Sequence, residues 1–338
     1  MPHPSFAFVR LPGESSQQVR VFTDSPRLVP QPIGVLNDTN SPDRFVFSPW
    51  NGSDQLYIWS DFQGVFMLGE VSQNIRHLHK RPFLTPSTPF EHFELGISRA
   101  KAQMESEDLA KVVLARELIM PQEVDWDVCM NLFEHLCGAH PQAFVYVCSS
   151  ENWGTWMGAS PETLVRYESG EVQVMSLAGT LFNEAESWSA KERAEQSVTS
   201  DFIRSCLNWQ ASDEIEVREL RQGGLRHLLS IYRKSWPRNL LAQLVQELSP
   251  TPAVCGSPRT QAAAFIAKEE GFLRDLYAGF MGVQQGGRFL SNVNLRCAEI
   301  GTDGIRLLAG CGINKESAAD REWQESALKM SVIGEYLS

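Results

Sequence analysis

The chain has 338 residues and a formal net charge of −11, with 43% apolar and 21% charged residues. This composition is typical of a globular protein, and the acidic excess disfavours a nucleic-acid partner, which would need a basic surface to displace counterions from phosphate. The first residues show no basic start followed by an apolar run, and no stretch approaches the roughly 18 apolar residues of a membrane helix. We therefore expect a cytoplasmic protein that does not bind a membrane.

The cysteine content points to a reducing compartment. The chain has seven cysteines, an odd number, and no CxxC pair occurs. Reduced thiols that pack as small apolar groups are the simplest interpretation. No exposed apolar helix is evident, so the oligomeric state stays open, with a monomer slightly favoured.

Strands come first along the chain. Residues 1–85 predict strands, because aromatic and β-branched runs alternate with Pro, Gly, Asn and Asp turns. The spacing of apolar positions predicts helices at residues 89–107, 127–140, about 185–209, 239–248, 258–275 and about 318 to the end. Between them we expect strands at 111–120 and 143–149, a hairpin over 163–180, extended segments at 213–220 and 227–236, and a strand-rich meander over 277–313.

The order of these elements indicates the fold class. Strands come in runs rather than in strict alternation with helices, which favours an α+β fold with large antiparallel sheets. No break in composition divides the chain, so we expect a single domain over residues 1–338. Residues 1–85 would contribute strands, and residues 90–338 carry the motifs described next.

Two acidic pairs lie on predicted helices: Glu192 with Glu195, and Glu322 with Glu325. The i,i+3 spacing puts both carboxylates of a pair on one helix face, where like charges repel unless a cation lies between them. Mg²⁺ prefers such carboxylate oxygens, together with water and substrate oxygens. The alternative is that each pair lies on a solvated helix face, since Glu is a good exposed helix former.

Two lysines are candidates for chemistry on an anionic substrate. Lys329 follows Glu325 by four residues, which fits either a surface ion pair or a lysine beside a metal that holds a substrate anion. Lys111 opens an apolar strand, so its side chain either extends to water or is buried. Burial would lower its pKa and make it a base near neutral pH.

Three further residues have an ordinary and a functional interpretation. Glu162, in a Ser-Pro-Glu turn, is either a plain turn carboxylate or a group projecting from the end of a sheet. Gly310, in AGCGIN, fits a tight hairpin or backbone amides that approach a carboxylate closely. Arg296 lies between apolar neighbours and needs an anionic partner if it points inward. A structural carboxylate and a substrate carboxylate fit it equally well.

Ten short blocks follow one another over about residues 90–338: KVVLARE, GASPETL, SLAGT, KERAEQ, HLLS, SPTPAVCGSPR, RDLYAG, VNLR, AGCGI and EWQESALK. In this order they resemble the signature blocks of the chorismate-utilising enzymes. That family includes isochorismate, anthranilate, salicylate and aminodeoxychorismate synthases.

The resemblance implies a fold and a set of binding residues. The fold is α+β, with two large, mostly antiparallel sheets packed face to face and helices outside. Glu195 and Glu325 match direct ligands of Mg²⁺, which binds the ring carboxylate of chorismate, and Glu192 and Glu322 match their partners through metal-bound water. The matching substrate-binding positions are Ala178, Gly179, Thr180, His227, Tyr277, Arg296, Gly310 and Lys329.

The resemblance also implies a reaction. In this family a nucleophile adds at C2 of chorismate while the C4 hydroxyl leaves. Glu162 matches the general acid that protonates the departing hydroxyl, and Lys111 matches the base that activates water. Ala178 stands where some aminodeoxychorismate synthases carry a nucleophilic Lys. Water attack would make the chain an isomerase that forms isochorismate reversibly.

Other members of the family remain alternatives. A salicylate synthase would form isochorismate and then eliminate pyruvate, and an anthranilate synthase component I or a non-catalytic chorismate-binding protein is less favoured. The motifs do not separate menaquinone from siderophore biosynthesis. Gln196 and Ser249 stand where the family usually has His, and Asn314 stands where Val is common. These departures leave the acid, base and metal ligands in place.

Overall fold

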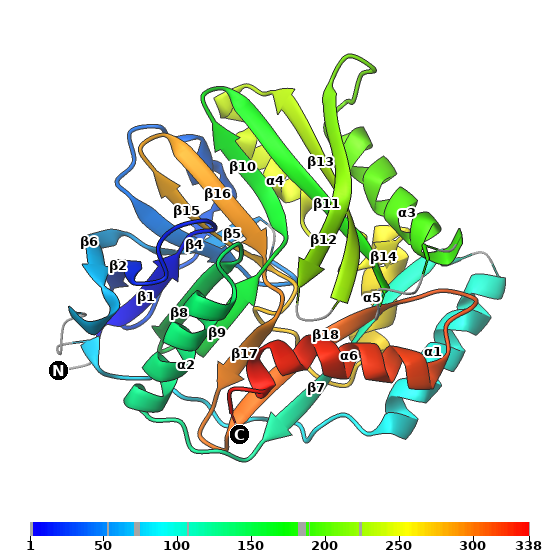
Figure 1. The fold of residues 1–338 in the computed structure, drawn as a ribbon, viewed down its shortest axis with the longest axis horizontal. Helices are drawn as coiled ribbons and strands as arrows, with labels where there is room; N and C mark the ends of the chain where they lie inside the picture. Colours follow the sequence, from blue (N-terminus) through cyan, green and yellow to red (C-terminus); the bar gives the residue numbers. More distant parts are fainter. Residues whose placement is uncertain are drawn as a thin grey trace.

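Two nine-stranded antiparallel sheets form the centre of the protein (Figure 1). The structure is a computed structural model. It describes residues 3–52, 54–70, 75–106, 108–181, 187–188, 190–222 and 225–337. Within these ranges, the side chains of residues 178–180, 190–192, 194–195, 222 and 225 lie outside the description.

The strands of each sheet come from distant parts of the chain. In order across the first sheet they are β14 (Gly256–Ser257), β7 (Lys111–Met120), β18 (Ile305–Ile313), β17 (Cys297–Ile300), β9 (Gly154–Ser160), β8 (Phe144–Ser150), β1 (Ser5–Arg10), β2 (Gln18–Asp24) and β6 (Asp61–Met67). In order across the second sheet they are β12 (Glu214–Gln222), β13 (Leu225–Ser235), β11 (Glu171–Leu181), β10 (Thr163–Glu168), β16 (Arg288–Val293), β15 (Phe280–Gln285), β4 (Arg44–Ser48), β5 (Gln55–Trp59) and β3 (Gln31–Pro32).

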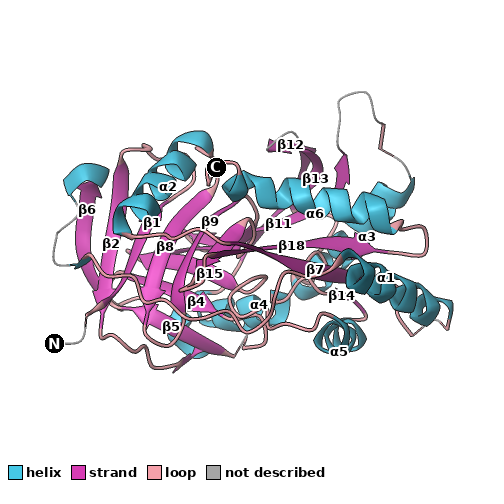
Figure 2. Cartoon of the chain, turned by 90° about the horizontal axis from the view of Figure 1, so that it is seen from below, coloured by secondary structure: helices cyan, strands magenta, loops and turns pink. Residues whose placement is uncertain are grey.

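Helices cover the outer faces of the sheets. They are α1 (Phe90–Glu105), α2 (Trp126–Ala139), α3 (Ala190–Cys206), α4 (Leu241–Leu248), α5 (Arg259–Glu269) and α6 (Ala319–Gly334), with short 3₁₀ turns η1 (Ile33–Asn37), η2 (Leu68–Glu70) and η4 (Arg238–Leu240). Figure 2 shows α1 and α6 beside β7 and β18, and α6 packs on β18. None of the described helices is long and apolar enough to cross a membrane.

An aromatic core joins the inner faces of the two sheets. Phe45 of the second sheet lies 6.4 Å from Tyr146 of the first, measured between ring centroids, and both are fully buried together with Trp59 and Trp156. Burial of one large side chain contributes about 1.5–3 kcal/mol. The prediction of an α+β fold with two antiparallel sheets packed face to face is confirmed.

Most predicted elements are present, including the six helices and the 163–180 hairpin. β1, β2 and β6 join the first sheet, whereas β3, β4 and β5 join the second. The single domain over residues 1–338 stays a prediction. It is supported by the N-terminal strands, because they are divided between the two sheets. All seven cysteines are free, as expected.

Two predicted details are wrong. The helix expected over 258–275 ends at Glu269, because Gly271 takes a positive φ of 75°, in which a helix does not continue. The predicted meander over 277–313 is divided: β15 and β16 belong to the second sheet, and β17 and β18 to the first.

Candidate active site

A cavity opens where the chain crosses from one sheet to the other. Glu162 lies in the crossing from β9 to β10, and Arg296 lies in the crossing from β16 to β17. Both line the cavity, together with residues of β7, β18 and α6. Two residues in the connections between strands, Glu162 and Arg296, therefore line the cavity at the junction between the sheets.

Eight of the predicted site residues line this cavity: Lys111, Glu162, His227, Tyr277, Arg296, Gly310, Glu325 and Lys329. Ala178, Gly179 and Thr180 follow Leu177, which also lines it, and the backbone of Thr180 pairs with His227. The side chains of these three residues lie outside the described part, as do those of Glu192 and Glu195. The structure thus gathers residues more than 200 positions apart in the sequence.

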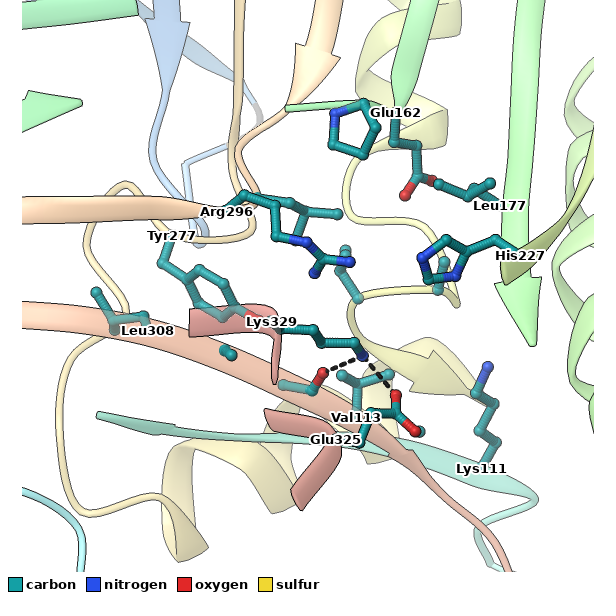
Figure 3. Close-up of a pocket in the computed structure, with 17 residues that line it drawn as sticks. Lys111, Val113, Glu162, Leu177, His227, Tyr277, Arg296, Leu308, Glu325 and Lys329 are labelled. Carbon is teal, nitrogen blue, oxygen red and sulfur yellow. Dashed lines mark hydrogen bonds and ion pairs between the residues drawn. The ribbon is translucent and has the colours of Figure 1, made fainter. Parts of the chain in front are cut away.

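Figure 3 shows Glu162 at the top of the cavity and Lys111 at the bottom, with His227 between them and Arg296 and Lys329 to one side. Glu162 is 2% exposed and Lys111 is 5% exposed, so neither is a solvated turn or edge residue. Burial raises the pKa of Glu162 to about 8, against the opposing pull of the cations Arg296, Lys111 and Lys329. The Glu162 carboxyl is therefore protonated at neutral pH and can donate a proton.

Close backbone packing fixes the position of Lys111. β14 pairs with the start of β7, where Ser257 lies opposite Lys111. A Cβ at Gly256 would lie 2.3 Å from the carbonyl oxygen of Lys111, so only glycine fits there. The SPTPAVCGSPR block thus holds the strand that carries this lysine.

Lys329 is a buried part of the site and not a member of a surface ion pair. Its ammonium lies 2.6 Å from a carboxylate oxygen of Glu325 and donates to the carbonyl oxygen of Gly310 at 2.7 Å. Both side chains are only 13% exposed. Burial alone would lower the pKa of Lys329, but the Glu325 carboxylate raises it on balance. Lys329 is therefore a permanent cation in the cavity.

Arg296 forms no salt bridge with a carboxylate of the residues that the structure describes, although the charges of Glu325 and Glu162 act on it. It is buried, and its guanidinium donates no hydrogen bond to any residue that the structure describes. Burial lowers its pKa, although the nearby Tyr277 and Glu325 counteract this. A buried arginine needs an anionic partner, and Glu325 and Glu162 are the carboxylates of the described residues whose charges act on Arg296.

Tyr277 and Gly310 fit together on the cavity wall. A Cβ on Gly310 would lie 2.9 Å from the hydroxyl oxygen of Tyr277, so the glycine makes room for the phenol. Burial raises the pKa of Tyr277 to about 12. The hydroxyl therefore stays a neutral hydrogen-bond donor beside Arg296 and Lys329.

Acidic side chains from α6 fit a divalent metal. One ligand atom each of Cys311, Glu322 and Glu325 lies within 4.8 Å of the others, and no other triple of His, Cys, Asp or Glu in the described part of the chain is so close. Glu322 faces inward and is 1% exposed, so the solvated-face alternative is wrong for this helix. Burial raises the pKa of the Cys311 thiol, so the thiol stays protonated and the two carboxylates are the groups that can bind a metal ion. Carboxylate oxygens suit Mg²⁺.

The second acidic helix is attached through a residue that departs from the family. Gln196 follows Glu195 in α3, and its amide donates to the carbonyl oxygen of Ser176 and to the hydroxyl of Ser230, each at 3.1 Å. These bonds link α3 to β11 and β13. Gln196 therefore positions the helix that carries Glu192 and Glu195.

A buried ion pair behind the cavity was missed by sequence reasoning. The guanidinium of Arg274 binds Glu270 at 2.5 and 2.8 Å, and it also donates to the carbonyl oxygens of Val113 and Val254. Glu270 accepts in addition from the backbone N–H of Ala115 at 2.7 Å. The i,i+4 spacing was visible, but a helix predicted through residue 275 placed both side chains on an ordinary helix face.

We expect Glu270→Gln to lower the free energy of unfolding by about 3 kcal/mol, because it leaves the Arg274 charge buried without its counter-ion. Urea titration measures this loss. Asp201→Asn is the matched control, since it removes an exposed pair with Arg204 at 3.3 Å, and it should cost less than about 1 kcal/mol. Equal losses in the two variants would contradict the special role of the buried pair.

Known proteins are similar to this chain in sequence. A family model described as chorismate binding enzyme matches residues 58–338. The salicylate biosynthesis isochorismate synthase of Pseudomonas aeruginosa is 34% identical over 269 residues, which cover 73% of this chain and 54% of that protein. Isochorismate synthase EntC of Escherichia coli is 28% identical over 260 residues, which cover 71% of this chain and 66% of that protein. The matches thus span between about half and two thirds of these curated relatives.

Solved structures share the fold. The menaquinone-specific isochorismate synthase MenF of Escherichia coli superposes with a TM-score of 0.79 at 19% identity, over 99% of this chain and 89% of that one. A protein described as a putative 2,3-dihydroxybenzoate-specific isochorismate synthase, DhbC of Bacillus anthracis, gives 0.78 at 22% identity, over 100% and 97%. At these identities the likeness establishes the fold alone.

Proposed function

We propose that this chain, which belongs to the chorismate binding enzyme family, isomerises chorismate to isochorismate. Water adds at C2 of the ring while the C4 hydroxyl leaves as water, so the reaction is a reversible exchange without a redox step. One observation carries the proposal: a protonated Glu162 and the amine of Lys111 lie at opposite ends of one buried cavity. The isochorismate synthases named above support it as relatives.

The cationic centre of the cavity suits a dicarboxylate such as chorismate. Arg296 and Lys329 supply two positive charges, and the Tyr277 hydroxyl, next to Gly310, supplies a neutral donor. We infer that they bind the substrate carboxylates, and that His227 and the backbone of residues 178–180 form the opposite wall. The negative charge of Glu325 offsets the ammonium of Lys329, which leaves Arg296 as the main partner for an anion.

Lys111 is the proposed base. It lies at the start of β7, which β14 holds by backbone pairing, and it lines one end of the cavity. It would take a proton from the water that attacks C2. Positioning of an acid and a base on opposite sides of the ring avoids direct proton transfer between them, and each contributes typically 10²–10⁴-fold to a rate.

Glu162 is the proposed acid. Burial holds its carboxyl neutral despite the nearby cations, and the buried Oε1 accepts no hydrogen bond from the described residues. A protonated carboxyl in this position would donate to the C4 oxygen as the C–O bond breaks. The same group would then act as base in the reverse direction.

Mg²⁺ is the proposed cofactor. Glu325 of α6 and Glu195 of α3 would hold it directly, and Glu322 and Glu192 would act through metal-bound water. When bound, the ion would offset the negative charge that a substrate carboxylate brings beside these glutamates. The seven free cysteines favour the reducing environment of the cytoplasm as the place where the enzyme works.

The direct test is incubation of the purified protein with chorismate and Mg²⁺, followed by chromatography of the products. We expect isochorismate, in equilibrium with chorismate, and loss of turnover when EDTA removes the metal. Salicylate with pyruvate would replace our first assignment by salicylate formation, and anthranilate formed with ammonia would indicate the amino-transferring branch. Chorismate binding without turnover would show a binding protein.

We expect Lys111→Ala and Glu162→Ala each to lower kcat at least about 10²-fold, because each removes one proton-transfer group. Lys315→Ala and Glu316→Ala are matched controls, since both side chains are exposed outside the cavity. Circular dichroism checks that the variants are folded. A folded Lys111→Ala variant with near-normal turnover would rule out the assigned base.

The pH profile tests the acid. The pKa of Glu162 is raised from 4.5 to about 8, so kcat/KM should fall as pH rises through about 8, when the proton to be donated is lost. The same shift makes the folded state bind one more proton than the unfolded state between these values. Stability should therefore decline with rising pH in that window by up to about 1.4 kcal/mol per unit. Glu162→Gln should lack this decline, and an unchanged slope would contradict the assigned pKa.

A further inference from the structure

Two segments beside the cavity carry unusual backbone geometry. Ala278, next to Tyr277, has a φ of 62°, and Arg296 has a φ of 48°. Positive φ is uncommon for residues other than glycine and persists only where neighbouring structure enforces it. The two residues that present the phenol and the guanidinium to the cavity therefore stand on segments that something else must hold in place.

Asn294 lies between these two segments and binds both ends of the first. Its backbone N–H donates to the carbonyl oxygen of Gly279 at 2.7 Å, and its carbonyl oxygen accepts from the N–H of Ala278 at 2.9 Å. Its side-chain amide donates to the carbonyl oxygen of Leu276 at 2.8 Å. Three hydrogen bonds thus fix the backbone on either side of Tyr277.

The remaining bond of Asn294 reaches the other sheet. The amide oxygen accepts from the hydroxyl of Tyr146 at 2.9 Å, and Tyr146 belongs to β8 of the first sheet. Both Asn294 and Tyr146 are fully buried. Asn294 therefore connects the Leu276–Gly279 segment to the rigid centre of the opposite sheet, two residues before Arg296.

We propose that Asn294 is a positioning residue, which through Leu276 and Tyr146 holds Tyr277 and Arg296 in the geometry that binds the substrate carboxylate. It does not line the cavity itself, so it acts only through these neighbours. A polar side chain with both amide groups satisfied in a dry interior fixes one arrangement of its partners. The identity of the carboxylate ligand rests on the proposed function, but the clamp on residues 276–279 does not.

Two variants release the clamp and one matched variant does not. Asn294→Leu keeps the branching at Cγ but removes both amide hydrogen bonds, and Tyr146→Phe removes only the bond to the first sheet. Ser291→Ala is the control: it deletes a buried hydrogen bond of the same strand, from Ser291 to the carbonyl oxygen of Val165 at 3.2 Å, that does not reach Tyr277. Melting temperatures report the general loss of stability in all three.

Hydrogen exchange and steady-state kinetics read out the specific effect. We expect Asn294→Leu to accelerate exchange of the amides in residues 276–279 and to raise KM for chorismate about tenfold while kcat falls less, because loss of position weakens substrate binding. Tyr146→Phe should also accelerate exchange and raise KM, but by less. Ser291→Ala should change neither the exchange in residues 276–279 nor KM. If Asn294→Leu only lowers the melting temperature, with exchange and KM like those of Ser291→Ala, the inference is overturned.

The test of the role of Asn294 can be separated from the test of activity on chorismate. If the wild-type protein does not turn over chorismate, the proposed function fails, while exchange in residues 276–279 still decides the role of Asn294. Unchanged exchange there in both Asn294→Leu and Tyr146→Phe overturns the clamp, whatever the substrate is.

Discussion

The buried ion pair between Glu270 and Arg274 is the interaction on which the interior around the cavity depends. A charged group taken out of water is tolerated only when its hydrogen-bonding capacity is met. Here the partners are backbone groups of β7 and of the turn before β14, together with the ring of Trp50 at 4.2 Å from the guanidinium. Satisfying this one pair therefore fixes two of the segments that line the cavity.

Burial then sets the charge of each group inside the cavity according to its neighbours. Lys329 has a carboxylate 2.6 Å away and stays charged. Glu162 has cations within electrostatic reach but no hydrogen bond at Oε1 to a described residue, and desolvation prevails, so it stays neutral. Lys329 thus keeps its proton because a carboxylate stabilises its charge, and Glu162 keeps its proton because burial disfavours its charged form. Different environments within one cavity set the protonation of each group, as acid–base chemistry at neutral pH requires.

The place of the site follows from the topology of the sheets. Two crossings between them, from β9 to β10 and from β16 to β17, interrupt the regular backbone pairing and carry Glu162 and Arg296, which line the cavity. β9 and β17 of the first sheet are fully buried, so each of these irregular connections is held at one end by a buried strand. Departures from regular structure, including the positive φ of Arg296, occur where the proposed chemistry needs them.

The sequence by itself determined the local elements and the chemical inventory. Apolar spacing identified the helices, and the ordered blocks identified the family and singled out Lys111, Glu162 and Lys329. Tertiary structure alone decided which strands share a sheet, that Glu322 faces inward, and that Asn294 and the Glu270–Arg274 pair support the cavity. The reason is physical: helical spacing and turns are properties of neighbouring residues, whereas burial, pKa and hydrogen-bond satisfaction are set by groups that only the folded chain brings together.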